Sequence, residues 1–291
     1  MTTTPDADPG PWSDLTRPPL RQAALRTALT SGDAPSWRAV EVTAQTGSTN
    51  ADLAARARDG EAPGLVLATD DQTSGRGRMA RDWTVPARSS IAVSVLLAPG
   101  APAERWGWLP LLAGVALVRA LTRTCGLPAV LKWPNDVLVP EPGGDLEYYK
   151  VSGILAEVVA GPGGPMVVLG TGVNVSQTRP ELPVPQATSL RLAGATGSDR
   201  DTVLRAYLRE LAAGYARWQD ADGDPRRSGL GAAYREACTT IGRRVELHLP
   251  GRGPLAGVAD GVDDDGRLLL VDDTGEQHAW AAGDVVHVRP S

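Results

Sequence analysis

The segment TDDQTSGRGRMARDW, residues 69–83, contains three arginines and two glycines between two apolar stretches. A glycine lets the backbone approach a ligand closely, and an arginine offers a planar set of donors that suits carboxylate and phosphate oxygens. The segment therefore predicts an anion-binding loop. Two other interpretations stay open on this segment alone: a solvated basic turn, and an Arg/Gly loop that lies on RNA.

The apolar stretches on either side predict the strands that support this loop. Residues 64–69 (GLVLAT) and 89–97 (SSIAVSVLL) are apolar and contain β-branched side chains. Further strands are predicted at 37–42, 129–139, 150–158 and 166–175. Helices are predicted at 20–29, 51–60, 106–126 and 199–220, and a shorter one ends near Cys238. The arginine-rich loop is thus expected at a sheet edge.

The composition excludes several classes of protein. With 291 residues, 42% of them apolar, and a formal net charge of −5, the chain is expected to be an ordinary soluble protein. General affinity for nucleic acid requires a basic surface, so the acidic balance argues against it. No apolar run is expected to approach the roughly 20 residues of a membrane span. Cys125 and Cys238 are far apart and predict reduced, buried thiols in a cytoplasmic protein.

Only two of the 29 basic residues are lysines, Lys132 and Lys150. Lys132 begins the sequence KWPND, and Lys150 follows the polar connection 140–149, so both lie beside one Pro-interrupted hairpin. An ammonium is a compact charge that can bind a single oxygen where a planar guanidinium would clash. The placement favours a functional need for an ammonium over chance, although the PND sequence alone is equally typical of a simple turn.

Polar residues and glycines at two other places have both a structural and a functional interpretation. The run QTGSTN, residues 45–50, precedes a predicted helix, so Ser48 or Thr49 is expected to cap it. In the functional interpretation the same hydroxyls and amide also line the polar end of a ligand. Gly170 and Gly172 interrupt the last strand of the central region. Such glycines mark a bulge or a close neighbour, which is either a ligand or a helix.

The last fifty residues have a different pattern. Four or five short strands joined by Gly/Asp turns, such as Asp264-Asp265-Gly266, predict a small all-β barrel. The three histidines, His248, His278 and His287, lie here without the close spacing of a zinc motif. They are predicted to be surface residues of strands.

Several motifs follow one another in the central part of the chain: GSTN at 47–50, Gln72 before GRGRxxRxW at 75–83, KWPND at 132–136, KVSGILAEV at 150–158 and GxGVNV at 170–175. This ordered set resembles the biotin protein ligase family. The resemblance implies an α/β (α+β) catalytic domain like that of class II aminoacyl-tRNA synthetases, with a mixed sheet, and a small C-terminal SH3-like β-barrel. The expected organisation is a disordered tail at 1–17, a biotin- and ATP-binding catalytic domain at 18–238 and the SH3-like domain at 239–291.

The resemblance implies the activity of an ATP-dependent biotin–[biotin carboxyl-carrier protein] ligase. In that reaction the biotin carboxylate attacks the α-phosphate of ATP, with Mg²⁺, to give biotinyl-5'-AMP. A lysine of a biotin carboxyl carrier domain then accepts the biotinyl group. An anion must approach a polyanion, and two unit charges of the same sign at ~4 Å repel by about 4 kcal/mol at an effective dielectric of ~20. Fixed cations from the arginine and lysine motifs would offset this repulsion.

The same resemblance implies roles for individual residues. The implied catalytic residues are Lys150 and Arg78. The implied biotin-binding residues are Ser48, Thr49, Asn50, Gln72, Arg76, Gly77, Arg78, Lys150 and Gly153. The implied ATP-binding residues are Arg78, Arg81, Trp83, Lys132, Asn135 and Asn174. Asp136 is implied to reach Mg²⁺ through water.

Two features depart from the family pattern: Ala80 stands where a glycine is usual, and the connection 140–149 is longer than expected. About 45 residues precede the GSTN motif, without a basic recognition helix, so no DNA binding is expected. The resemblance implies a monomer or a weak ligand-dependent homodimer that does not bind membranes. The competing functions are a lipoate–protein ligase of the same fold and, from another class, an Arg/Gly-loop RNA-binding protein.

Overall fold

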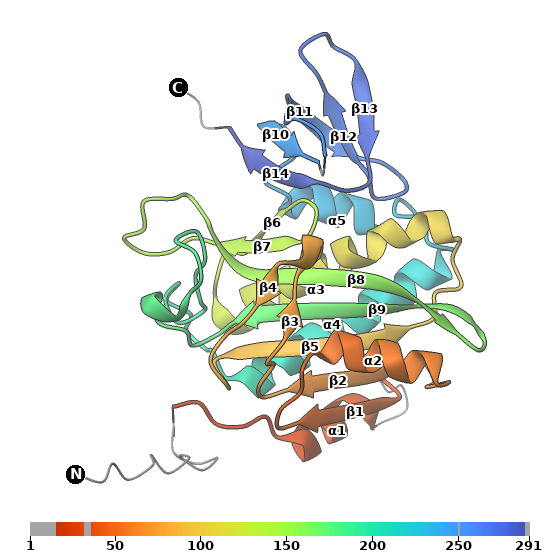
Figure 1. Ribbon diagram of the computed structural model, residues 1–291, viewed down its shortest axis with the longest axis vertical. Helices are drawn as coiled ribbons and strands as arrows, with labels where there is room; N and C mark the ends of the chain where they lie inside the picture. The colour runs from red at the N-terminus through yellow and green to blue at the C-terminus, as the bar shows by residue number, and fades with distance from the viewer. Residues whose placement is uncertain (1–15, 32–35, 250, 289–291) are drawn as a thin grey trace.

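Two large β-sheets organise the molecule (Figure 1). This computed structural model describes residues 16–31, 36–249 and 251–288. The larger sheet is mixed, with strand order β1-β2-β5-β9-β8-β7-β6, and only its β1–β2 pair is parallel. Its strands are β1 (Ala39–Thr43), β2 (Leu65–Thr69), β5 (Ser90–Leu97), β6 (Val130–Lys132), β7 (Asp136–Val139), β8 (Tyr149–Gly161) and β9 (Gly164–Asn174). Together with the β-rich C-terminal domain, this sheet confirms the predicted fold class.

The predicted disordered tail lies outside the described residues except for its last two. Arg17 is held in place, because its guanidinium donates to Glu181 Oε2 at 2.7 Å and to the carbonyl oxygen of Ser176 at 3.2 Å. The hydrogen bond from Arg17, together with those from Thr178, lowers the pKa of Glu181 to about 2. The domain boundaries given above remain predictions.

Helices pack on both faces of the larger sheet. On one face, Leu53 and Ala57 of α2 (Thr49–Arg58) join a buried cluster with Leu65 and Leu67 of β2. On the other face, the residues that alternate with these in β2 join a larger cluster with the remaining helices. These are α1 (Gln22–Thr30), α3 (Trp108–Cys125), α4 (Arg200–Asp220) and α5 (Leu230–Ala237). The strand is apolar throughout because both of its faces are buried.

Side-chain caps begin α2 and α4, and the cap of α2 was expected from the sequence. Ser48 is the N-cap of α2, and its hydroxyl accepts a hydrogen bond from the Ala51 amide at 3.4 Å. Asp199 is the N-cap of α4, and its carboxylate accepts from the Thr202 amide at 2.8 Å. These bonds satisfy amide groups that have no partner within the helix.

The helical segment Ala103–Cys125 is long and apolar enough to cross a membrane by length and composition. The expectation that no segment approaches this length is therefore wrong by that criterion. Its most apolar window has a mean hydropathy of 1.2, and 67% of that window is buried inside the protein. The apolar composition is explained by packing, because α3 packs against strands β6 to β9 and against α4 and supplies much of the core.

The five-stranded sheet docks on the start of α3 and on the KWPND hairpin. Its strands are β10 (Arg244–His248), β11 (Leu255–Val262), β12 (Leu268–Val271), β13 (Gln277–Trp280) and β14 (Asp284–His287). Trp108 Nε1 donates to the carbonyl oxygen of Asp264 at 3.0 Å, and Trp133 Nε1 donates to that of Gly266 at 3.3 Å. Trp133 is only 1% exposed. A tryptophan is present in this hairpin because its indole fills the junction between the two domains.

His287 belongs to this junction and is half-buried, unlike the surface residue that the sequence predicts. The Thr240 hydroxyl accepts a hydrogen bond from the Trp133 amide and lies 3.1 Å from His287 Nε2. Burial, with smaller contributions from Lys132 and Arg243, lowers the pKa of His287 to about 4. His248 is exposed on β10, as predicted.

Replacing Gly266 tests the docking of the two domains. Gly266 has φ +83°, and the Cβ of an alanine there would lie 2.7 Å from the carbonyl carbon of Gly107. Gly266→Ala is expected to lower the free energy of unfolding by about 2–4 kcal/mol, because a left-handed conformation and a backbone clash add together. Gly261→Ala, with nothing within 4 Å, is the matched control. Equal urea unfolding midpoints for the two variants would contradict this contact.

His287 is also expected to make stability depend on pH. Its pKa falls from 6.5 in the unfolded chain to about 4 in the fold, so between these values the unfolded chain binds more protons. The free energy of unfolding should therefore fall as pH falls through this range, by on the order of 1–2 kcal/mol after solvent screening. His287→Gln should flatten this slope in urea titrations, while His248→Gln should keep it. If the free energy of unfolding of His287→Gln depended on pH as steeply as that of the parent protein, another group would be responsible.

Candidate active site

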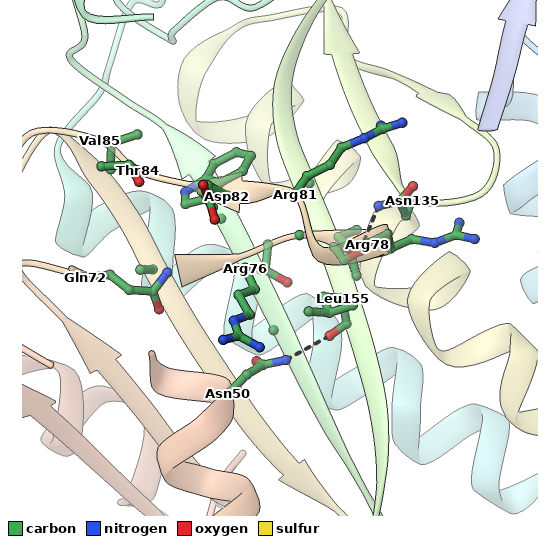
Figure 2. A pocket seen from close by; sticks show the side chains of 18 of the residues that line it. Asn50, Gln72, Arg76, Arg78, Arg81, Asp82, Thr84, Val85, Asn135 and Leu155 are labelled. Carbon is green, nitrogen blue, oxygen red and sulfur yellow. Dashed lines mark hydrogen bonds between the residues drawn. The ribbon is translucent and has the colours of Figure 1, made fainter. Parts of the chain in front are cut away.

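A cavity of about 510 Å³ opens on the face of the larger sheet that α2 also covers (Figure 2). Its floor is formed by alternate residues of three neighbouring strands: Ala92 and Ser94 of β5, Gly170, Gly172 and Asn174 of β9, and Gly153 and Leu155 of β8. Its walls come from the start of α2, the arginine-rich loop, the KWPND turn and the loop 183–187. Asp284 of the C-terminal domain completes the rim.

The cavity brings together most of the predicted site residues. Those that line it are Ser48, Thr49, Asn50, Gln72, Arg76, Gly77, Arg78, Arg81, Trp83, Asn135, Asp136, Lys150, Gly153 and Asn174. Lys132 lies outside the lining. It is half-buried and pairs across the hairpin with Asp136. Burial, aided by repulsion from Lys150, lowers the pKa of Lys132.

The arginine-rich loop is a short β-ribbon above the cavity. β3 (Gly75–Arg76) pairs with β4 (Asp82–Trp83), and a 3-10 turn (Arg78–Ala80) joins them. A Cβ at Gly75 would lie 2.2 Å from Gln72 Nε2, so a glycine is needed for this close approach. The Gly77 amide donates to the Arg81 carbonyl oxygen at 2.7 Å and closes the ribbon. The three arginines are therefore presented by hydrogen-bonded backbone.

The glycines of β9 make room for two side chains that line the cavity. A Cβ at Gly170 would lie 2.1 Å from Asn50 Oδ1, and one at Gly172 would lie 2.6 Å from the ring of Trp83. The sequence left open a ligand or a helix as the neighbour: at Gly170 it is the helix α2, whereas at Gly172 it is Trp83 of the arginine-rich loop. A larger residue at either glycine would displace a wall of the cavity.

One end of the cavity is lined by neutral hydrogen-bonding groups. The Thr49 and Ser94 hydroxyls are 2.7 Å apart, and the Ser94 hydroxyl donates to Asn50 Oδ1 at 2.6 Å. Gln72 Oε1 accepts from the Thr49 amide at 3.1 Å. In Figure 2 the guanidinium of Arg76 lies between Gln72 and Asn50, so one arginine faces this polar end.

The other end concentrates positive charge. Lys150 Nζ lies 2.6 Å from Asp136 Oδ1. Burial lowers the pKa of Arg78, an effect that Asp284 and Asp136 oppose. Arg81 forms an ion pair with Asp284, which joins the loop to β14 of the C-terminal domain. The cations are thus held in place by two carboxylates, and both domains contribute.

Asn135, Asn174 and Trp83 differ in how many of their side-chain hydrogen-bonding groups have a partner within the protein. Asn135 Nδ2 donates to the Ile154 carbonyl oxygen at 2.9 Å. Asn174 donates to the Thr188 carbonyl oxygen and accepts from Gln177, so its amide is engaged on both sides. Trp83 Nε1 is buried and has no hydrogen-bond partner among the described residues. The indole nitrogen is therefore covered by protein and, within the described part of the chain, unpaired, although Trp83 itself lines the cavity.

Several lining residues were not predicted from the sequence. Among them are Ser94, Pro183, Val184, Ala187 and Asp284. The only signal for Ser94 was a hydroxyl within an otherwise apolar, alternating strand. Asp284 is one of many acidic residues in turns of the C-terminal domain, and no local pattern relates it to Arg81, which is 203 residues away.

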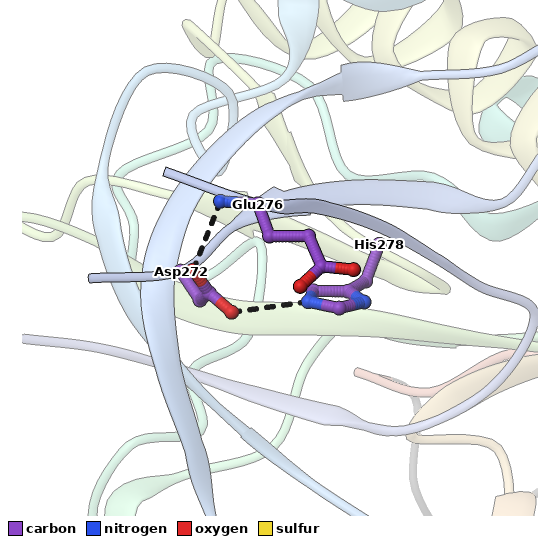
Figure 3. A group of neighbouring side chains, drawn as sticks. All are labelled: Asp272, Glu276 and His278. Carbon is purple, nitrogen blue, oxygen red and sulfur yellow. Dashed lines mark hydrogen bonds and ion pairs between the residues drawn. The ribbon is translucent and has the colours of Figure 1, made fainter. Parts of the chain in front are cut away.

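Among the described residues, one group has the ligand types for a metal ion: Asp272, Glu276 and His278 (Figure 3). Asp272 begins the turn between β12 and β13, and its carboxylate accepts from the amides of Thr274 and Glu276. It also lies 3.0 Å from His278 Nε2. Because these hydrogen bonds engage the Asp272 carboxylate, the three residues are explained by their role in stabilising the turn.

Comparisons with known proteins agree with this geometry. A model of the biotin/lipoate A/B protein ligase family matches residues 41–174, and one of the biotin protein ligase C terminal domain matches residues 240–288. The chain is 44% identical over 281 residues to a biotin–[acetyl-CoA-carboxylase] ligase of Mycobacterium tuberculosis, covering 95% of this chain and 98% of the relative. It is 34% identical over 244 residues to one of Paracoccus denitrificans, covering 82% and 97% of the two chains.

A solved biotin protein ligase of Aquifex aeolicus, in complex with biotin and ATP, superposes with a TM-score of 0.70 at 25% identity. The alignment covers 87% of this chain and 100% of that one. A mixed sheet with a polar-to-cationic cavity and a small C-terminal β domain thus define a protein ligase of the biotin/lipoate class. Because full-length relatives are 44% and 34% identical, the chain belongs to the biotin protein ligase family within that class.

The ion pair between Arg81 and Asp284 predicts how easily the loop opens. Asp284→Asn removes the charge that holds Arg81, and an exposed pair of this kind contributes up to about 1 kcal/mol, so tryptic cleavage at the loop arginines should become roughly two- to fivefold faster. Asp273→Asn removes a carboxylate of the same domain that pairs with Arg244, away from the loop. Equal cleavage rates in the two variants would show that the pair does not restrain the loop.

Proposed function

We infer that this chain is an ATP-dependent biotin protein ligase: it activates biotin as biotinyl-5'-AMP and transfers it to a lysine of a biotin carboxyl carrier domain. The observation that carries this conclusion is a single cavity in which hydroxyl and amide groups line one end and Arg78 and Lys150 line the other. Such a cavity is complementary to a small molecule that is neutral and hydrogen-bonding at one end and acidic at the other. The names of the relatives and the complex of the Aquifex aeolicus protein support the same activity.

In this proposal the polar end binds the ureido group of biotin. Ser48, Thr49, Asn50 and Gln72 supply the hydrogen-bonding groups, and Arg76 closes over them. Gly77 and Gly153 leave the backbone accessible beside the ligand. Buried polar groups that would otherwise lack partners reject a ligand that cannot satisfy them, which gives selectivity.

The cationic end permits the first chemical step. A carboxylate oxygen of biotin forms a bond to the α-phosphorus of ATP while the bond from that phosphorus to the bridging oxygen breaks and pyrophosphate leaves. Two negative unit charges at ~4 Å repel each other by about 4 kcal/mol at an effective dielectric of ~20. The positive charges of Arg78 and Lys150 offset this repulsion between the carboxylate and the phosphate. The amine of the acceptor lysine then forms an amide bond with the activated carbonyl carbon, and AMP leaves with its electron pair.

The nucleotide is placed on the same side. Trp83, Asn135 and Asn174, which line the cavity, are proposed to contact the adenosine, with Arg81 on phosphate. Lys132 is proposed to act at longer range, since it pairs with Asp136 across the hairpin but lies outside the cavity lining.

The donor set fits Mg²⁺ in the way this ion is usually held with nucleotides. Mg²⁺ takes one or two carboxylates together with waters and phosphate oxygens. Asp136 would hold it through water, beside Lys150. The ion would supply charge neutralisation on the phosphates, and the residues of this chain position the reacting groups.

The remaining assignments are proposals of the same kind. The acceptor is the biotin carboxyl carrier domain of an acyl-CoA carboxylase, the location is the cytoplasm, and the protein is a monomer or a weak ligand-dependent homodimer that does not bind DNA. A lipoate–protein ligase is the nearest alternative, because the matching family model includes both activities. ATP–pyrophosphate exchange that depends on biotin and not on lipoate separates the two. The RNA-binding alternative lacks support, because the arginines line a cavity whose carboxylates partly balance them.

Lys150→Met tests the role of the ammonium. Loss of one fixed cation at the reacting oxygens is expected to lower biotin-dependent ATP–pyrophosphate exchange at least about 100-fold. The thermal midpoint should change little, because the Lys150–Asp136 pair is partly exposed. Arg26→Met removes one exposed charge of α1 and should retain parental exchange. Near-parental exchange in Lys150→Met would remove this residue from the mechanism.

A further inference from the structure

The amide of Asn50 has a fixed orientation, set by a residue that does not line the cavity. Asn50 Nδ2 lies 2.6 Å from Glu157 Oε2 and 3.5 Å from the carbonyl oxygen of Leu155. A carboxylate and a backbone carbonyl can only accept hydrogen bonds. The nitrogen of the amide must therefore face β8, and its oxygen must face β5. Figure 2 shows the amide between the start of α2 and Leu155.

This orientation fixes the direction of two further hydrogen bonds. Asn50 Oδ1 has no proton, so the Ser94 hydroxyl, 2.6 Å away, must donate its single proton to it. The contact of 2.7 Å between Ser94 and Thr49 then requires the Thr49 hydroxyl to donate its own proton. Thr49 is 3% exposed and Ser94 is fully buried, so bulk water does not readily replace these bonds.

In the chain Glu157–Asn50–Ser94–Thr49 the Thr49 proton is used inside the protein, by Ser94 Oγ at 2.7 Å in competition with Gln72 Oε1 at 3.3 Å. Thr49 lines the cavity, so what it offers there is an acceptor lone pair. If the Asn50 amide were turned over, Nδ2 would donate to Ser94 and Ser94 to Thr49, which would occupy a lone pair of Thr49 and release its proton to Gln72 or to a ligand. The hydrogen-bonding character of the cavity wall thus depends on which way one amide points.

We propose that Glu157 is a positioning residue that makes the polar end of the cavity select a ligand with an N–H group at that end. It acts through Asn50 and Ser94 and sets Thr49 as an acceptor. This inference rests on the proposed function, in which that end holds the ureido group of biotin. A cyclic urea carries N–H donors, whereas the dithiolane of lipoate has none. This chain of hydrogen bonds therefore favours biotin over lipoate as the ligand.

The position of Glu157 distinguishes this role from a structural one. Glu157 is exposed on β8, so its single hydrogen bond contributes little to folding. Its replacement should leave the thermal midpoint nearly unchanged and act on ligand selection. The neighbouring residue Val158 is 66% exposed and offers a control on the same strand.

The experiment compares the affinity for biotin with that for biotin methylated on either ureido nitrogen, by calorimetry on the full-length protein. The ratio of the two dissociation constants measures how strongly the site requires the N–H. Glu157→Gln keeps an acceptor oxygen and should keep the parental ratio. Glu157→Ala leaves only the longer contact to Leu155 and should lower the ratio about threefold, and Glu157→Lys, which offers a donor, should lower it about tenfold.

Two further variants make the outcome decisive. Val158→Lys adds a charge at the next position and should keep the parental ratio. Ser94→Ala interrupts the chain, so Glu157→Ala should have no further effect on the ratio in that background. A parental ratio in both Glu157→Ala and Glu157→Lys overturns the inference and leaves the proposed function standing. Absence of biotin binding by the parent protein overturns both.

Discussion

The cavity exists because strand β9 has no side chains at Gly170 and Gly172. In the middle of a sheet, residues at these positions would fill the space above the neighbouring strands. Their absence admits Asn50 from α2 and Trp83 from the arginine-rich loop, each within a distance that a Cβ would not allow. The two glycines thus bring together a helix and a loop that are not part of the sheet, and the rest of the site is arranged around them.

Different interactions determine ligand binding at the two ends of the cavity. At the cationic end the important quantity is charge, and Asp136 and Asp284 hold Lys150 and Arg81 in position while lowering the cost of placing them near each other. At the polar end the important quantity is the direction of hydrogen bonds, which is set by groups that can only accept. Net charge acts over several ångströms and tolerates small displacements, whereas hydrogen-bond direction requires contact distances near 2.7 Å.

Much of this arrangement is encoded locally and could be predicted from the sequence. The apolar runs of β2 and β5, the cap of α2 and the ordered motifs were sufficient for the sheet, the helices and 14 of the 29 residues that line the cavity. Contacts that join distant segments could not be predicted in the same way. Asp284 meets Arg81 only because the C-terminal domain docks through Trp108 and Trp133, and no local pattern reports that docking.

Lys132 and Ser94 show that membership of a motif and a position in the cavity lining do not always coincide. Lys132 belongs to a motif, yet it lies outside the cavity lining, although Asp136, its partner across the hairpin, is part of that lining. Ser94 belongs to no motif, yet it lies on the floor and links Thr49 to Asn50. A motif identifies which segments approach a ligand, but the pleat of the supporting strands decides which side chains reach it. Selectivity at the polar end consequently depends on β5 and β8 as much as on the residues of the GSTN motif.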